Sequence, residues 1–159
     1  MTDPKRELLR HTVATLAYRA GKTVRGALPS FAMYGSEATD RTPAKILTHM
    51  GDLMDWALSM SQGRKEWHDS APLAWDAEVE RFFAAIKAFD DFLASDALLA
   101  VSAEKLFQGP VADALTHTGQ LAMLRRMAGC KMRGESYFAA DIVAGRVGTE
   151  QAAPKREFD

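Results

Sequence analysis

Three residues of the chain, His49, Asp113 and His117, have side chains of the types that bind divalent metals. Asp113 and His117 are four residues apart, so in a helix their side chains leave adjacent turns on the same side. His49 lies between Ile46 and Leu53 at helical spacing, on the flank of an apolar face. Two imidazoles and a carboxylate suit a first-row divalent metal and leave one coordination position open for water or substrate. The pattern favours a metal site if His49 faces the other two from a second helix.

These residues also have a simpler interpretation. A helical Asp–His pair at this spacing is often a surface contact worth only about 0.2–0.5 kcal/mol, and His49 alone is typical of a hydrogen-bonded histidine at the edge of a core. Asp52, three residues after His49, could accept a hydrogen bond from the ring and orient it, or be a solvated aspartate. Gln120 and Trp56 are further candidates for lining a pocket, with helix packing as the alternative for both.

Other polar residues are weaker candidates for a role in the site. Arg125 and Arg126 lie near the end of the last predicted helix, where positive charge offsets the helix dipole. The alternative is that one of them clamps a carboxylate of an anionic thiol cofactor. His68 lies in a loop, from which it could reach the mouth of a pocket. The single cysteine, Cys130, cannot form an intramolecular disulfide.

The elements that must position these residues are helices. Apolar residues recur at spacings of three and four in four segments. They predict helices at about residues 4–27, 43–61, 75–94 and 110–128. The first two begin with a capping side chain followed by proline, at Asp3-Pro4 and Thr42-Pro43, and Gly129 is expected to end the last. The predicted fold is all-α, a four-helix bundle.

Two stretches are less regular. Residues 96–107 are expected to be helical in part, and the Gly109-Pro110 pair is expected to break the chain and begin the fourth helix. Residues 130–159 form a short C-terminal extension. The four helices do not obviously need the apolar side chains of residues 135–147, so we expect this segment to pack over the bundle or across a subunit interface.

Composition sets broad limits on function. The 159 residues fit a single domain, residues 1–159, with 47% hydrophobic and 26% charged residues. A net charge of −1 supplies no broad positive field, which argues against binding to nucleic acid or an anionic membrane. The longest apolar runs, such as residues 97–101, fall far short of the ~20 residues that span a bilayer. The first residues lead into an amphipathic segment rather than an apolar signal core, so a cytoplasmic location is expected.

Residues 112–129 resemble the last bundle helix of the DinB-like (YfiT-like) superfamily. In that family a metal-binding histidine is followed by Gly-Gln and an apolar residue, which residues 117–121, His-Thr-Gly-Gln-Leu, match. Residues 46–50, Ile-Leu-Thr-His-Met, are similar to the second-helix segment that carries the first ligand. The likeness covers most of residues 1–130.

The resemblance implies that His49, Asp113 and His117 bind a divalent metal. Most members have histidine where this chain has Asp113, but members similar to mycothiol-dependent maleylpyruvate isomerase have glutamate, so a carboxylate is compatible. The implied activity is a metal-dependent hydrolase, or a transferase that uses a low-molecular-weight thiol, acting on a small-molecule substrate. Zinc or nickel is the expected metal, with iron or manganese as alternatives, and a homodimer is expected.

Two other functions fit the same residues. The first is a non-catalytic, ligand-binding or stress-related dimeric bundle in which the metal is vestigial or absent. The second is a non-haem iron site, which two histidines and one carboxylate would also suit. The chain has no Gly-rich phosphate loop, His-Glu-x-x-His helix or nucleophile elbow, so familiar nucleotide and protease chemistries are not expected.

Overall fold

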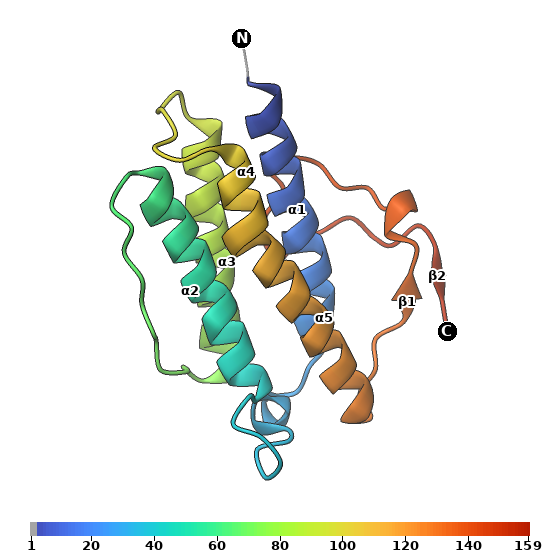
Figure 1. The fold of residues 1–159 in the computed structure, drawn as a ribbon. Helices are drawn as coiled ribbons and strands as arrows, with labels where there is room; N and C mark the ends of the chain where they lie inside the picture. The colour runs from blue at the N-terminus through green and yellow to red at the C-terminus, as the bar shows by residue number, and fades with distance from the viewer. Residues whose placement is uncertain (1–2) are drawn as a thin grey trace.

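A computed structural model describes residues 3–159 and shows a mostly helical protein (Figure 1). Within these residues, four long helices lie side by side: α1 (Pro4–Val24), α2 (Pro43–Ser61), α3 (Trp75–Ala94) and α5 (Ala112–Met127). Both α1 and α2 pack against α3 and α5, so α1 and α2 occupy opposite corners of the group. The predicted all-α class is confirmed.

Helices α1 and α2 begin where the sequence places capping side chains. The Asp3 carboxylate and the Thr42 hydroxyl each accept a hydrogen bond from a backbone N–H in the first turn of the helix that follows. Helices α2 and α3 have the predicted bounds. Helix α1 ends at Val24, earlier than predicted, because Arg25 is extended and Gly26 takes a φ of +74°, a conformation open to glycine.

The core is formed by the facing apolar sides of the helices. Its largest fully buried apolar side chains are Val13, Leu16, Leu47, Met50, Met54, Phe82, Ile86, Phe89, Leu93, Leu106 and Leu121. The short 3-10 helix η1 (Pro29–Met33) covers one end, where Phe31 meets Trp75 edge to face with ring centres 5.6 Å apart. In residues 3–159 we find no helix with both the length and the apolarity needed to cross a membrane.

The last long helix begins earlier than predicted. Helix α4 (Ala103–Leu106) starts after its cap Ser102 and continues through a π-helical turn, η2 (Phe107–Val111), directly into α5. The partial helix expected in residues 96–107 is confirmed, and the break predicted at Pro110 is wrong. Proline clashes with the carbonyl four residues earlier in an ordinary helix. The wider turn of a π-helix accommodates the Pro110 ring without ending the helix.

The C-terminal extension contains a small sheet that the sequence analysis did not predict. Strand β1 (Gly134–Glu135) pairs antiparallel with β2 (Glu157–Phe158), with Gly134 opposite Phe158. A Cβ on Gly134 would lie 2.7 Å from the Phe158 ring, so only glycine leaves room for this pairing. The chain therefore returns at its end to β1, which lies a short way beyond the end of α5 (Figure 1).

The extension packs against α1. The ring of Tyr137, in the 3-10 helix η3 (Tyr137–Ala139), meets Tyr18 edge to face at 6.1 Å between centres. The Arg19 guanidinium lies 4.1 Å from the centre of the same Tyr137 ring, and Val147 is buried. Packing of this segment over the helices, one of the two alternatives expected for residues 135–147, is confirmed.

Candidate metal centre

His49, Asp113 and His117 converge between α2 and α5. The Nε2 atom of His49 lies 3.5 Å from Oδ2 of Asp113, and Nε2 of His117 lies 3.3 Å from Oδ1 of the same carboxylate. The two imidazole rings are perpendicular, with centres 4.8 Å apart. One ligand atom from each residue lies within 4.8 Å of the others. The three residues predicted from the sequence form a group that could hold a metal ion.

The separations between these atoms suit a small cation. Ligands at about 2.0–2.1 Å from a tetrahedral Zn²⁺ are about 3.4 Å from one another. The separations between Asp113 and the imidazoles, 3.5 Å from His49 to Oδ2 and 3.3 Å from His117 to Oδ1, are close to this length, but each imidazole faces a different oxygen of the carboxylate. Binding of one ion through a single Asp113 oxygen requires side-chain rotations at the site. Three protein ligands leave one position of a tetrahedral ion open.

The π-helical turn lies directly before the part of α5 that carries both Asp113 and His117. Asp113 lies in the first turn of α5, directly after η2, and His117 follows one turn later. Pro110 and Val111 are buried, and η2 packs against α2. This contact fixes the start of α5 beside the helix that carries His49. Single π-helical turns occur frequently at functional sites because they rotate the residues that follow.

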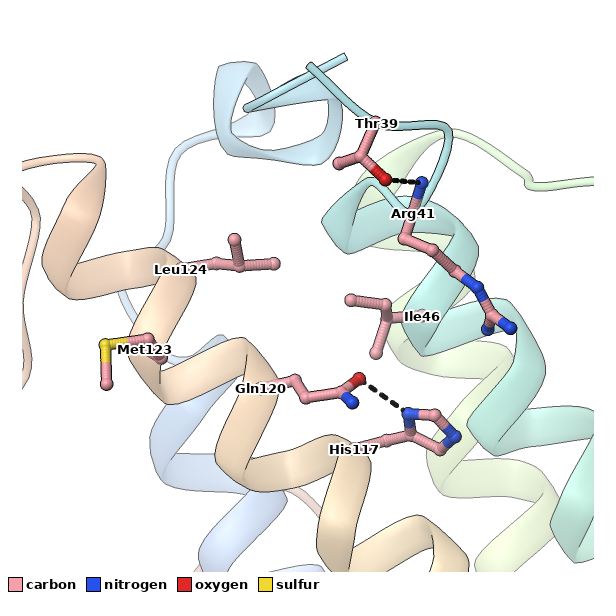
Figure 2. Close-up of a pocket in the computed structure, with 7 residues that line it drawn as sticks. All are labelled: Thr39, Arg41, Ile46, His117, Gln120, Met123 and Leu124. Atoms are coloured by element: carbon pink, nitrogen blue, oxygen red, sulfur yellow. Dashed lines mark hydrogen bonds between the residues drawn. The ribbon is translucent and has the colours of Figure 1, made fainter.

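Gln120 determines which nitrogen of His117 is available to a metal. Oε1 of Gln120 lies 2.7 Å from Nδ1 of His117 (Figure 2). A carbonyl oxygen only accepts hydrogen bonds, so Nδ1 carries the proton and donates it. In the neutral ring the lone pair is then on Nε2, the atom that faces Asp113. The sequence analysis placed Gln120 beside the site, and the structure gives it this contact.

Two cavities flank the centre. The first, of about 470 Å³, has seven lining residues: Thr39, Arg41, Ile46, His117, Gln120, Met123 and Leu124 (Figure 2). The second, of about 420 Å³, is lined by His49 and by residues of the loop between α2 and α3. The side chains of His49 and Asp113 are 28% and 46% exposed and that of His117 is 11% exposed. A metal held here would therefore be accessible to small molecules.

Asp52 lines the second cavity but does not orient His49. Its buried carboxylate accepts hydrogen bonds from the backbone N–H of Ser70 at 3.0 Å, from the Ser70 hydroxyl at 2.7 Å, and from Arg81. Three residues after His49, the side chain turns toward α3 and the loop rather than toward α5. Neither alternative considered from the sequence describes Asp52: its partners are Ser70 and Arg81 rather than His49, and its carboxylate is buried rather than solvated.

Trp67 is a residue of the site that the sequence analysis did not identify. Its ring meets His49 edge to face with centres 5.7 Å apart, and it meets Trp56 edge to face, also at 5.7 Å. Trp67 thus links Trp56 to the histidine of the site. The indole Nε1 of Trp67 donates a hydrogen bond to Asp69 at 3.2 Å. A large aromatic side chain in an otherwise polar loop was the only signal available, and His68 beside it is exposed.

Arg125 serves the end of α1 and not the metal centre. Its buried guanidinium donates hydrogen bonds to the backbone carbonyls of Thr23 at 3.1 Å and Arg25 at 2.7 Å, and to that of Cys130 at 3.1 Å. These bonds satisfy carbonyl groups that the end of a helix leaves without partners. The alternative in which Arg125 clamps a carboxylate of a thiol cofactor is therefore wrong, because its guanidinium is engaged by backbone carbonyls, and Arg126 is exposed.

The centre thus combines ligand-type side chains from two helices with a cavity on either side. The side-chain amide of Gln120 orients the imidazole of His117. Comparisons of the chain with protein-family models, with curated proteins and with solved structures find no match.

Proposed function

We propose that the protein is a divalent-metal-dependent enzyme whose metal is bound by His49, Asp113 and His117. The observation that carries this proposal is the meeting of three ligand-type side chains with atoms within 4.8 Å of one another. The Gln120 contact strengthens it. With Nδ1 of His117 donating to Gln120, Nε2 and the Asp113 oxygen are two acceptors 3.3 Å apart. In the neutral ring these two acceptors repel each other, and either a bound cation or a second ring proton donated to Asp113 relieves the repulsion.

Zn²⁺ or Ni²⁺ is the metal that we propose. Imidazole nitrogen suits both ions, and the two separations of 3.5 and 3.3 Å support tetrahedral Zn²⁺. Fe²⁺ and Mn²⁺ are alternatives that the test below includes. A metal with an open position lowers the pKa of a bound water toward ~7, or stabilises a thiolate, at neutral pH. The proposed activity is therefore hydrolysis, or transfer to a low-molecular-weight thiol.

We also propose that the fold is a four-helix bundle of the DinB-like kind. The support is the place of the ligands, with His49 on the second long helix and Asp113 and His117 on the last, as the resemblance of residues 46–50 and 112–129 implies. The side-by-side packing of α1, α2, α3 and α5 is consistent with it. A homodimer, which the resemblance also implies, stays a prediction.

Metal titration of the purified protein tests the proposal. We expect wild-type protein to bind one equivalent of Zn²⁺ or Ni²⁺, and the H117A variant to bind none. At a hundred times its Kd the metal stabilises a single site by about 2.7 kcal/mol, which thermal melts detect. The matched control is H68A, which removes an exposed histidine from outside the centre. If wild type and H117A melt identically with and without Zn²⁺, Ni²⁺, Fe²⁺ and Mn²⁺, the proposal fails and a non-catalytic protein is favoured.

Two assays on the metal-loaded protein separate the reactions. An activated ester reports hydrolysis, and an electrophile supplied with a small thiol reports transfer. We expect one of them to depend on metal and on His117. If neither does, although the metal is bound, the enzymatic part of the proposal fails and a metal-binding protein without these activities remains.

A further inference from the structure

Arg41 lies between the two cavities that flank the metal centre and lines both of them. It belongs to the loop that precedes α2. Its backbone N–H donates to the hydroxyl of Thr39 at 3.1 Å, which fixes the loop at this residue. Figure 2 shows its side chain running from the loop toward the end of the cavity that holds His117.

The N–H groups of the Arg41 guanidinium are available to donate hydrogen bonds to a ligand. Three other arginines are engaged by the protein: Arg10 pairs with Asp90, Arg81 with Asp52, and Arg125 with backbone carbonyls. The ion pairs and side-chain hydrogen bonds found across residues 3–159 include no partner for the Arg41 guanidinium. Five N–H donors in a planar fork are thus available beside the centre.

The walls of the first cavity are largely apolar. Ile46 from α2 and Leu124 from α5 point toward each other across it (Figure 2), and Met123 adds a flexible thioether. Among the described residues that line this cavity, Arg41 is the one with a permanent charge. A volume of about 470 Å³ lies in the range of small-molecule sites.

The second cavity is less suited to an anion. It is lined by Asp40, Asp52 and Asp69 as well as by Arg41 and Lys45. The first cavity has no carboxylate among its lining residues. An anion attracted to Arg41 therefore meets less repulsion on the side of Ile46 and Leu124.

We propose that Arg41 binds the anionic head of the substrate, and that the substrate is a small amphipathic oxyanion, a carboxylate or a phosphate with an apolar portion. The planar guanidinium pairs with either head through two parallel hydrogen bonds. The apolar portion lies between Ile46 and Leu124, with the reacting group toward His117. This inference rests on the proposed function, since it takes the cavity beside the metal as the place of the substrate.

Nuclear magnetic resonance titration of the metal-free protein tests this inference. The probes are hexanoate, hexyl phosphate and neutral 1-hexanol, added to nitrogen-15-labelled protein in the presence of a chelator. We expect at least one of the two anions to shift the amide signals of Ile46 and Leu124, and the tighter of them to identify the head group. We expect 1-hexanol to bind about tenfold or more weakly, because it cannot form the charge-assisted pair.

Two variants give the test its specificity. R41Q should weaken binding of the anion about tenfold or more and leave the affinity for Zn²⁺ unchanged, whereas R126Q, at an exposed arginine outside both cavities, should change neither. The spectra themselves report that each variant is folded. The inference is overturned if neither anion binds, if 1-hexanol binds as well as both anions, or if R41Q binds them as wild type does. Failure of Zn²⁺ to bind would instead contradict the proposed function and leave binding of the anion intact.

Discussion

Nδ1 of His117 and Oε1 of Gln120 lie 2.7 Å apart on successive turns of α5. This contact directs the other ring nitrogen, Nε2, toward the carboxylate of Asp113 at 3.3 Å. Ligand histidines in metal sites commonly have such an acceptor on the second nitrogen, which fixes the tautomer and the ring orientation. Gln120 is therefore a positioning residue for the proposed metal, although its own atoms do not belong to the group of three ligands.

Replacing Gln120 with alanine should weaken metal binding without abolishing it. The ring of His117 loses its acceptor, and the loss of such a partner costs about 10–100-fold in affinity. Competition with a chromophoric chelator measures the change. Q120E, which keeps an acceptor, should retain most of the affinity, and Q108A, at an exposed glutamine away from the centre, should retain all of it. Equal affinities in wild type and Q120A would show that the contact does not position the ring.

Gly51 allows Arg81 to cross α2 and hold the loop that carries Trp67. A Cβ at residue 51 would lie 2.6 Å from Nη1 of Arg81, whose guanidinium is held by the carbonyl of Thr48 at 2.9 Å and by Asp55 at 2.9 Å. Arg81 cannot move aside without losing these bonds. We expect G51A to lower the free energy of unfolding by about 1–3 kcal/mol and to change the intrinsic fluorescence, to which Trp67 contributes together with Trp56 and Trp75.

The matched control for this variant is another glycine inside a helix. Gly119 lies in α5, is exposed, and has nothing within 4 Å of a Cβ placed there. G119A should therefore raise the free energy of unfolding by about 0.5–1 kcal/mol, the usual gain of alanine over glycine in a helix. Urea denaturation measures both variants. Equal effects of the two substitutions would contradict the role given to Gly51.

Glu135 anchors the C-terminal extension through a buried charge. Its side chain is fully buried and accepts hydrogen bonds from Lys22 at 2.6 Å and from Tyr18. We expect E135Q to lower the free energy of unfolding by about 1–3 kcal/mol, because Lys22 and Tyr18 lose a charged acceptor while Lys22 keeps its ion pair with Glu157. D91N, which breaks the exposed pair of Lys87 and Asp91, should change it little. Thermal melts measure both, and a small effect of E135Q would mean that the extension is not anchored there.

The same cluster should make stability fall at alkaline pH. Burial raises the pKa of Tyr18 above its usual value of 10.0, and the hydrogen bond to Glu135 raises it further. Burial alone would lower the pKa of Lys22, but its hydrogen bonds to Glu135 and Glu157 raise it above 10.5. The folded protein thus holds both protons more tightly than the unfolded chain does. Their contribution is complete below pH 10.0 and decreases as the pH rises toward the folded values.

Denaturation midpoints measured from about pH 9 to about pH 12 test this dependence. Y18F removes the phenol that titrates and keeps the ring, so its midpoint should fall less steeply with pH than that of wild type. Y34F, at a tyrosine for which the structure shows no such carboxylate contact, is the control. Identical slopes in wild type and Y18F would contradict the assignment.

The fold could be predicted where its signals were local. The bounds of α2 and α3 follow from apolar spacing, and that of α2 also from the cap at Thr42. The helix break predicted at Pro110 was wrong. The π-helical turn that replaces it depends on the burial of Pro110 and Val111 against other elements, which local sequence does not show. The strands β1 and β2 are two residues each and carry no alternating pattern. Their pairing depends on the path of the chain between them, which brings β2 back beside β1.

The residues of the site also divide into those whose placing follows from local spacing and those whose placing depends on how the helices pack. The placing of Asp113 and His117 on adjacent turns follows from a spacing of four residues, whereas their meeting with His49 depends on the packing of α2 against α5. The contact of Asp52 with Arg81 could not be predicted, because the spacing of Asp52 from His49 carries no information about a residue of α3. Trp67, in a loop, belongs to no periodic pattern that could have marked it.

The central claim, that one ion lies between His49, Asp113 and His117, is tested most directly by anomalous diffraction from crystals grown with Zn²⁺ or Ni²⁺. The account predicts a single anomalous peak between α2 and α5, about 2.0–2.2 Å from Nε2 of each histidine and from an Asp113 oxygen. No peak at this place, with the two imidazole rings turned away from each other, would contradict it.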